Sequence, residues 1–220
     1  MHAAANEIGA QAYLDALLAR DSGRAARVVT DAVADGVAIE DIYLGILQAA
    51  LYEVGHRWVT GKVNVAEEHY ATAVTQRLLE TLSAQIRVPP SDGRLALVSA
   101  TPGELHEIGA RMVADFLEAD GWEVLQLGAS TPAPDLAALV DSERPDLVAL
   151  STATAGSLPG IAQVLSELRR LKTPPLIVVG GQFWTAETSR SARDLGADLV
   201  TRDPRELVTL ARERVRPHGD

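Results

Sequence analysis

The sequence predicts two domains: an all-α bundle of four helices, followed by an α/β domain with a five-stranded, doubly wound parallel sheet of the flavodoxin-like type. Three observations lead to this fold class. Apolar residues recur at helical spacing through residues 6–87, strand-like and helix-like segments alternate over residues 94–215, and the segment between them contains two adjacent prolines. Prolines stop a helix, and a polar segment that contains them is typical of a domain boundary. We therefore expect domains at residues 6–87 and 94–215.

Four amphipathic helices are expected in the first domain. They fall at residues 7–20, 22–35, 40–59 and 65–86. Asp21 offers a cap for the second helix, and Asn64 with Glu67 three residues later offers a cap with its return partner for the fourth. Gly36 and Gly61 mark helix ends. The apolar stripe of the fourth helix is expected to consist of Ala71, Val74, Leu78 and Leu82.

Five strands alternate with five helices in the second domain. The strands fall near residues 95–100, 123–127, 147–150, 176–179 and 198–201, and the helices near 110–120, 133–141, 158–171, 186–195 and 204–215. The first, third and fourth strands are apolar on both faces, as expected when helices cover both sides of a parallel sheet. The loops after the first four strands therefore open at one edge, where ligands bind in sheets of this kind.

This edge is expected to gather His106, Gly128, Ser151, Gly180 and Gly181. Glu104 lies two residues before His106, so that its carboxylate can meet the imidazole in a turning backbone. A neutral imidazole can bind a metal through one nitrogen while the other donates to a carboxylate. Gly109 leaves room for a bulky group close to the backbone. From these residues alone, a metal-binding histidine and a surface histidine in an ordinary helix-entry loop are both open.

The pattern Glu-x-His-x-x-Gly in the first loop, a serine after the third strand and Gly-Gly after the fourth resemble the cobalamin-binding domain family. The resemblance implies that His106 ligates cobalt from below, in place of the benzimidazole base, and that Glu104 holds the histidine. Gly109, Ser151 and 180–181 are then further cofactor-binding positions. Many members have Ser-x-Leu at the third strand, whereas this chain has Ser-Thr-Ala beside the expected groove for the nucleotide tail.

A second group of residues lies where the third and fourth helices meet. Trp58 is followed, after nine residues, by Glu68 and His69. With Ala71 at the centre of the apolar stripe, a rotation of about 100° per residue puts Glu68 near the edge of the stripe and His69 on the opposite side. Taken singly, the tryptophan could be a core or helix-end aromatic and the glutamate a favourable acid in a first helical turn.

On a four-helix domain that precedes a cobalamin domain, this group resembles the adenosylcobalamin-dependent photoreceptors. The resemblance implies that the bundle caps the upper face of the corrin, Trp58 packs on the adenosyl group, Glu68 accepts hydrogen bonds from its ribose or base, and His69 adds a polar contact. Two departures stand out. Such photoreceptors usually carry an N-terminal DNA-binding helix-turn-helix module, for which this sequence has no room. Val59 replaces a histidine that can take the upper cobalt site after light, and His56 is the nearest histidine.

Composition narrows the classes of function. The chain has 220 residues, 47% of them hydrophobic, no cysteine and a net charge of −10. We therefore expect no disulfide or thiolate metal site, a reducing, cytoplasmic location and no direct binding to nucleic acid. Neither a signal peptide nor an apolar run of about 20 residues is evident. The chain also lacks a Gly-x-Ser-x-Gly elbow and a phosphate loop, so we do not expect an enzyme.

Three functions remain open. The first is a light sensor with adenosylcobalamin as chromophore, in which breakage of the cobalt–carbon bond drives a conformational or oligomeric change. The second is a corrinoid carrier for a methyltransferase, although a methyl group does not need the Glu-His pair of the bundle. The third is a cobalamin-dependent antirepressor that acts through a transcription-factor or other effector partner. The expected partners are thus cobalamin, an effector protein and, in light or dark, further copies of the chain.

Overall fold

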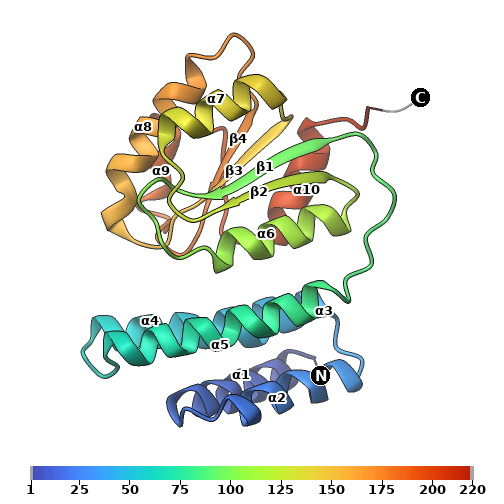
Figure 1. Ribbon diagram of the computed structural model, residues 1–220, viewed down its shortest axis with the longest axis vertical. Coiled ribbons are helices and arrows are strands. Elements are labelled where there is room, and N and C mark those ends of the chain that lie inside the picture. The colour runs from blue at the N-terminus through green and yellow to red at the C-terminus, as the bar shows by residue number, and fades with distance from the viewer. Residues whose placement is uncertain (1, 219–220) are drawn as a thin grey trace. The chain divides into compact units, whose positions relative to one another are not determined.

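The computed structural model describes residues 2–218 and the side chains from residue 7 onward. It divides into two compact units, one ending at Ile86 and one beginning at Arg87. The first unit is helical, and the second contains a five-stranded parallel sheet between helices (Figure 1). The fold class predicted from the sequence is therefore confirmed.

The helical unit begins its helices where the capping signals predict. Its α-helices are α1 (His2–Leu18), α2 (Ser22–Ala34), α3 (Ile39–Ile42), α4 (Ala49–Val59) and α5 (Val65–Ser83). The side chain of Asp21 accepts a hydrogen bond from a backbone N–H in the first turn of α2, and Asn64 and Glu67 form a reciprocal capping box at the start of α5. Gly36 and Gly61 follow α2 and α4 with φ of 77° and 73°, a conformation that favours glycine.

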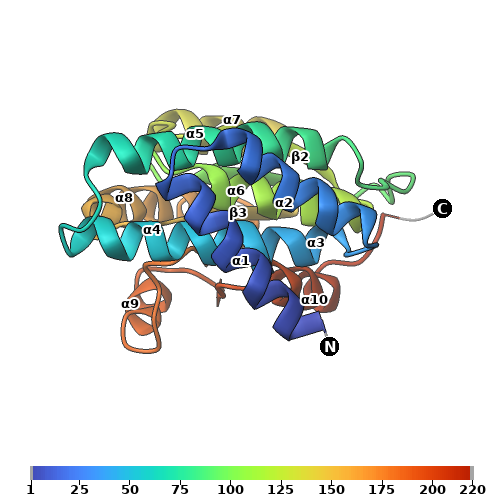
Figure 2. The same ribbon diagram turned by 90° about the horizontal axis from the view of Figure 1, so that it is seen from below.

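The third predicted helix is not one continuous α-helix. A π-helical segment, η1 (Tyr43–Gln48), joins α3 to α4. A Cβ built on Gly9 of α1 would lie 2.9 Å from Cδ1 of Ile46, so α1 crosses this segment at close range (Figure 2). The hydroxyl of Tyr43 also donates to the backbone carbonyl of Leu79 (3.4 Å). These contacts across the bundle accompany the wider helix, and spacing along the chain does not show them.

The buried stripe of α5 also differs from the prediction at one position. Leu79, not Leu78, is fully buried, and Thr75 is buried beside it. The hydroxyl of Thr75 lies 2.9 Å from the hydroxyl of Tyr13 and donates to the carbonyl of Ala71 (2.8 Å). A polar residue can enter the core when its hydrogen bonds are satisfied, and a purely apolar pattern therefore overlooked it.

The second unit places its strands in the order β2-β1-β3-β4-β5, all parallel. They are β1 (Leu95–Ala100), β2 (Glu123–Gly128), β3 (Leu147–Ser151), β4 (Leu176–Gly180) and β5 (Leu199–Val200). The helices are α6 (Ile108–Ala119), α7 (Ala133–Glu143), α8 (Leu158–Arg169), α9 (Ser189–Asp194) and α10 (Pro204–Arg214). The order of the strands reverses between β1 and β3, which makes the loops after these two strands the expected ligand crevice.

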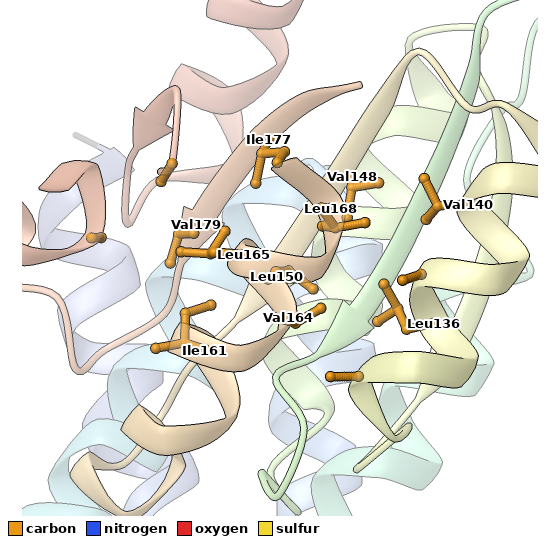
Figure 3. Packing of buried hydrophobic residues seen from close by; sticks show 14 of the residues in the cluster. Leu136, Val140, Val148, Leu150, Ile161, Val164, Leu165, Leu168, Ile177 and Val179 are labelled. Carbon is orange, nitrogen blue, oxygen red and sulfur yellow. The ribbon is translucent and has the colours of Figure 1, made fainter. Parts of the chain in front are cut away.

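Two apolar cores lie on opposite faces of the sheet. On one face, Val148, Leu150 and their neighbours pack against α7, α8 and α9 (Figure 3). On the other face, alternate residues such as Ala96 and Ala149 pack against α6 and α10. Burial on both faces explains the continuous apolar runs of β1, β3 and β4, and it fixes the strand ends from which the site loops start.

No helix within residues 2–218 combines the length and the apolar composition that a membrane span requires.

Candidate functional site

The loop between β1 and α6 turns the side chain of Glu104 inward and that of His106 outward. The backbone N–H of Glu104 donates to the carbonyl of Thr101 (2.8 Å), and Gly103 has a φ of 84° that glycine adopts without strain. The side chain of Glu104 is 2% exposed, whereas that of His106 is 40% exposed. The loop thus holds a buried carboxylate directly behind an accessible imidazole.

The two oxygens of Glu104 have different partners. Oε1 accepts from the backbone N–H of His106 (3.1 Å) and lies 2.5 Å from Nδ1 of its ring. Oε2 accepts from the backbone N–H groups of Ala153 (3.0 Å) and Thr154 (2.9 Å), the hydroxyl of Thr154 (3.0 Å) and that of Ser157 (2.9 Å). One oxygen therefore faces the histidine, and the other is tied to the loop after β3.

These hydrogen bonds keep Glu104 ionised. Burial by itself would raise the pKa of the carboxyl, but the hydrogen bonds from His106, Ser157 and Thr154 outweigh it and lower the pKa to about 2. An ionised carboxylate has only acceptor sites, so Nδ1 of His106 is the donor in this pair. In the neutral imidazole with Nδ1 as donor, Nε2 carries the lone pair, which is the form in which an imidazole ligates a metal.

The strand ends bring the other predicted residues of this edge together. Ser151 pairs in register with Gly180, and the hydroxyl of Ser99, opposite Gly128 in the sheet, donates to its carbonyl (3.4 Å). A Cβ built on Gly109 would lie 2.9 Å from Oγ of Ser151. The loop that carries His106 therefore starts at the end of β1 and leads into a helix whose Gly109 lies beside Ser151 at the end of β3.

The glycines at this edge are required by the protein's own packing. A Cβ on Gly181 would lie 2.2 Å from the carbonyl oxygen of Thr152, and one on Gly180 would lie 2.7 Å from the carbonyl oxygen of Thr201. Gly181 also has a φ of 107°. Side chains at these positions would push the loops after β3, β4 and β5 apart. We therefore expect the two glycines to be needed for these loops to pack together at this edge.

The side chains at this edge suit a metal that is already coordinated by a cofactor and needs few ligands from the protein. His106 offers one imidazole nitrogen, and within residues 2–218 no group of three or more His, Cys, Asp or Glu side chains is arranged to hold a bare metal ion. Cobalt in a corrin ring needs one axial ligand from the protein. The residues present therefore fit a corrinoid.

The second group of predicted residues lies at the joint of α4 and α5. Trp58 lies in the last turn of α4 with 41% of its surface exposed, and Val59, which ends the helix, is also exposed. In the first turn of α5, Nδ1 of His69 lies 2.6 Å from Oε2 of Glu68, whose Oε1 accepts from the hydroxyl of Thr72 (2.8 Å). The glutamate side chain is 12% exposed and the histidine 74%, as the helical spacing predicts.

His56 lies two residues before Trp58 on the same helix and is also exposed. Two residues correspond to a rotation of about 200°, so His56 and Trp58 lie on nearly opposite sides of α4. Val59 follows His56 by three residues and lies about 60° from it around the helix, so His56 and position 59 share one side of α4.

Sequence reasoning missed Thr154 and Ser157. They lie 50 and 53 residues after Glu104, in a segment that the sequence marks only as the entry to a helix. Capping residues of this type are common, and nothing local links them to a distant carboxylate.

Comparison with known proteins finds B12-binding domains in both units of the chain. A family described as the B12 binding domain matches residues 94–211, and a second family of the same description matches residues 10–83. The HTH-type transcriptional repressor CarA of Myxococcus xanthus is 37% identical over 186 residues, which are 83% of this chain and 62% of the relative. The HTH-type repressor CarH of the same organism is 36% identical over 62% of this chain and 45% of the relative. The chain thus spans about half the length of these two relatives.

Other matches are corrinoid proteins. Dimethylamine corrinoid protein 1 of Methanosarcina acetivorans is 24% identical over 76% of this chain and 79% of the relative. The structure of the Methanosarcina barkeri monomethylamine corrinoid protein matches with a TM-score of 0.82 and 20% identity, over 92% of this chain and 96% of that chain, which shows a common fold. The chain belongs to the B12-binding family, with a helical and an α/β B12-binding domain, and it is related to the CarA and CarH repressors.

Proposed function

We propose that this cobalamin-binding protein is a light sensor that uses adenosylcobalamin as its chromophore and acts without catalysing a reaction. One observation carries the proposal. Trp58 is a large aromatic side chain, 41% exposed at the end of a helix, in a unit whose next helix carries near its start a Glu68–His69 pair with the histidine exposed. An adenosyl group has a flat base and ribose hydroxyls that need such partners, whereas a methyl group needs neither.

In this proposal the two domains divide the binding of the cofactor. The α/β domain, residues 94–215, would hold cobalt through Nε2 of His106, with Glu104 fixing the ring through Nδ1. Gly109, Ser151, Gly180 and Gly181 shape the edge from which the histidine projects. A buried, hydrogen-bonded carboxylate holds the imidazole in its binding tautomer before any ligand arrives.

The helical domain, residues 6–87, would hold the adenosyl group. The indole of Trp58 would stack on the adenine, a contact that is worth about 1–3 kcal/mol per base in other proteins. Each carboxylate oxygen can accept more than one hydrogen bond, so Glu68 can accept from a ribose hydroxyl while it retains Thr72 and His69. His69, the more exposed of the pair, adds a polar contact.

Bound adenosylcobalamin would supply absorption of green to near-ultraviolet light and a weak cobalt–carbon bond that light breaks. Loss of adenosine would remove the stacking partner of Trp58 and the hydrogen-bond partner of Glu68. The helical domain would then favour another arrangement or assembly, which an effector protein could recognise. The names of the CarA and CarH relatives favour a transcription factor as that effector.

A corrinoid carrier for a methyltransferase is the second candidate. It is favoured by the fold shared with the monomethylamine corrinoid protein and by the dimethylamine corrinoid relatives. In that case Trp58 would shield a small upper ligand between encounters with a partner enzyme. A cobalamin-dependent antirepressor that docks on a transcription factor is a third candidate, and it shares the relation to the repressors with the sensor.

The test begins with the apoprotein and adenosylcobalamin in the dark. The visible spectrum and the gel-filtration volume are recorded before and after green light, with methylcobalamin as the parallel ligand. The sensor predicts stable dark binding, preference for the adenosyl form, and a light-driven change in both spectrum and size. Binding with a spectral change but no change in size or shape would contradict it.

Two further measurements distinguish the carrier and the antirepressor from the light sensor. Preference for methylcobalamin together with turnover by an added methyltransferase would support the carrier. Capture of a transcription factor in a manner that depends on cobalamin but not on light would support the antirepressor.

A further inference from the structure

The chain just before β1 contains a buried arginine with several partners. The side chain of Arg94 is only 4% exposed, and its guanidinium carbon lies 4.4 Å from the centre of the Trp122 ring. Nε donates to both carboxylate oxygens of Asp92 (2.9 and 2.8 Å). Nη2 donates to the backbone carbonyl (3.0 Å) and the carboxylate (3.3 Å) of Asp120. Charged groups enter a protein interior where such partners replace water, so Arg94 ties Asp92 to the turn between α6 and β2.

The two prolines of the same segment also lie against this turn. A Cβ built on Gly121 would be 3.7 Å from Cγ of Pro89 and 3.6 Å from the carbonyl oxygen of Pro90, which are ordinary contact distances. The backbone N–H of Asp92 donates to the carbonyl of Gly121 (3.0 Å). Residues 89–94, which we call the anchored segment, therefore pack as part of the α/β unit.

The C-terminal part of the chain contacts the anchored segment as well. A Cβ built on Gly93 would lie 3.1 Å from Cβ of His218, whose Nε2 is 2.9 Å from Oδ1 of Asp146, just before β3. In α10, Nε of Arg212 donates to Oδ1 of Asp120 (2.7 Å), the carboxylate that the buried arginine also contacts. Contacts from the end of α6 and from the C-terminal residues therefore hold the anchored segment together.

Two residues before the anchored segment lack such contacts. The backbone N–H of Ile86 donates to the carbonyl of Ser83 (3.0 Å), so the turn that ends α5 reaches Ile86. Arg87 and Val88 are exposed, and within residues 7–218 neither forms a hydrogen bond or an ion pair. The residue before a proline is restricted to extended backbone, which leaves Arg87 as the freer of the two.

We propose that Arg94 anchors a short hinge: it holds residues 89–94 on the α/β unit and confines relative movement of the two units to Arg87 and Val88. The anchor sets the length of the tether between the units. Two extended residues span at most about 7 Å, whereas the eight residues 87–94 would span about 28 Å. A short tether keeps the helical unit at a high effective concentration for the α/β unit. The inference goes beyond the proposed function, because a sensor, a carrier and an antirepressor would all use the same hinge.

The test uses two variants and a matched control in the full chain. Arg94→Met removes the guanidinium and keeps an unbranched apolar side chain beside Trp122. Asp92→Ala removes the partner on the anchored segment and leaves Arg94 paired with Asp120, so it tests the anchor even if Arg94→Met is unstable. Arg169→Met is the control, because Arg169 also bonds a backbone carbonyl and an aspartate, but in the turn between α9 and β5. Circular dichroism and thermal unfolding verify that each variant folds.

Backbone ¹⁵N relaxation of the full chain without cobalamin is the first measurement. In the wild type and in Arg169→Met, we expect order parameters near about 0.85 for residues 92–94 and below about 0.6 for residues 87–88. In Arg94→Met and Asp92→Ala, the low values should extend through residue 93, because the segment has lost its anchor. Low values at residues 92–94 or high values at residues 87–88 in the wild type would overturn the proposal, and so would rigid residues 92–93 in both variants.

The distance between the two units is the second measurement. The chain has no cysteine, so Thr30→Cys in α2 and Glu143→Cys in α7 supply two exposed and unique sites for spin labels. Double electron–electron resonance then gives the distribution of distances between the labels. Arg94→Met and Asp92→Ala should widen this distribution about twofold, because the span of a flexible chain grows with the square root of its length and the tether grows from two residues to eight.

The width in Arg169→Met should match that of the wild type, and an unchanged width in both other variants would overturn the proposal. Neither measurement involves the cofactor or light, so the hinge and the sensor are judged separately. A chain that binds adenosylcobalamin and responds to light would keep the sensor proposal even if the hinge variants behaved like the wild type.

Discussion

The molecule contains two Glu–His pairs that look alike in sequence and differ in structure. In the α/β unit, Glu104 is buried and is bound by residues from two loops, whereas in the helical unit the side chain of Glu68 is bound by His69 and Thr72 of its own helix. The Nδ1–carboxylate distances are similar, at 2.5 and 2.6 Å. The difference teaches that distance within a pair says little about its role, because the number of partners behind the carboxylate decides how rigidly the histidine is held.

The largest difference is expected in stability. Glu104→Gln places an amide where Oε2 accepts four hydrogen bonds and Oε1 accepts two. If the NH₂ group takes the place of Oε2, it faces the donors of the loop after β3. If it takes the place of Oε1, His106 loses its acceptor. We expect the unfolding free energy of the α/β unit to fall by about 3–5 kcal/mol, because about two buried donors would lose their acceptor at a cost of about 1–3 kcal/mol each. Urea unfolding followed by tryptophan fluorescence measures it, because Trp122 and Trp184 are buried in this unit.

The matched variant is Glu68→Gln in the helical unit. Its pair is partly exposed and local, so we expect a loss below about 1 kcal/mol. Circular dichroism at 222 nm follows the helices of both units, and a transition without a change in the fluorescence of Trp122 and Trp184 reports the helical unit. Equal losses in the two variants would remove the distinction between a preorganised and a loosely held pair.

The next difference concerns cobalamin affinity. His106→Ala removes the proposed cobalt ligand, and we expect the affinity for cobalamin to fall on the order of 100-fold, which corresponds to about 2.7 kcal/mol. His69→Ala removes one polar contact with the upper group, and we expect a loss below about 10-fold that is confined to the adenosyl form. Titrations followed by the visible spectrum compare both variants with adenosylcobalamin and methylcobalamin. A larger effect of His69→Ala would reverse the proposed roles.

Alkaline pH should lower the stability of the helical unit, which carries the Glu68–His69 pair. Burial raises the pKa of Tyr13 from 10.0 to about 12, although its hydrogen bond to Thr75 of α5 acts in the opposite direction. The unfolded chain then releases the proton at lower pH than the folded chain. The contribution of Tyr13 is thus complete below pH 10 and is lost as the pH rises to about 12, by about 1.4 kcal/mol per pH unit.

Thermal unfolding of the helical unit between pH 9 and 12 measures this loss. Tyr13→Phe should be less stable at pH 9 and less sensitive to pH. A slope that is unchanged in Tyr13→Phe would show that another group causes the alkaline loss.

The last comparison tests the contact with the adenosyl group alone. Trp58→Ala should reduce the preference for adenosylcobalamin over methylcobalamin by about 10-fold, because stacking on a base contributes about 1–3 kcal/mol. Trp58→Phe should retain part of the preference. The ratio of the two dissociation constants is the measured quantity, and a ratio that is unchanged in Trp58→Ala would contradict contact with the adenosyl group.

Much of the fold was predictable because its signals are local. The capping box of Asn64 and Glu67, the glycine after α2 and the apolar runs of β1, β3 and β4 each reflect a preference expressed over a few residues. The π-helical segment η1 and the burial of Leu79 instead of Leu78 were missed, since both depend on contacts between helices that are distant in the chain. The physical reason is that packing selects among several local conformations of similar energy.

The same division holds for the site. The sequence by itself determined that Glu104 and His106 lie in the loop after the first strand of a parallel sheet, because two residues of spacing suffice for the pair to meet. Only the tertiary structure decided how the pair is supported. Thr154 and Ser157 reach Glu104 across 50 and 53 residues, after β1 and β3 have paired and brought their ends together. A hydrogen bond depends on distance in space, and the order of the strands, which spacing along the chain does not specify, sets that distance.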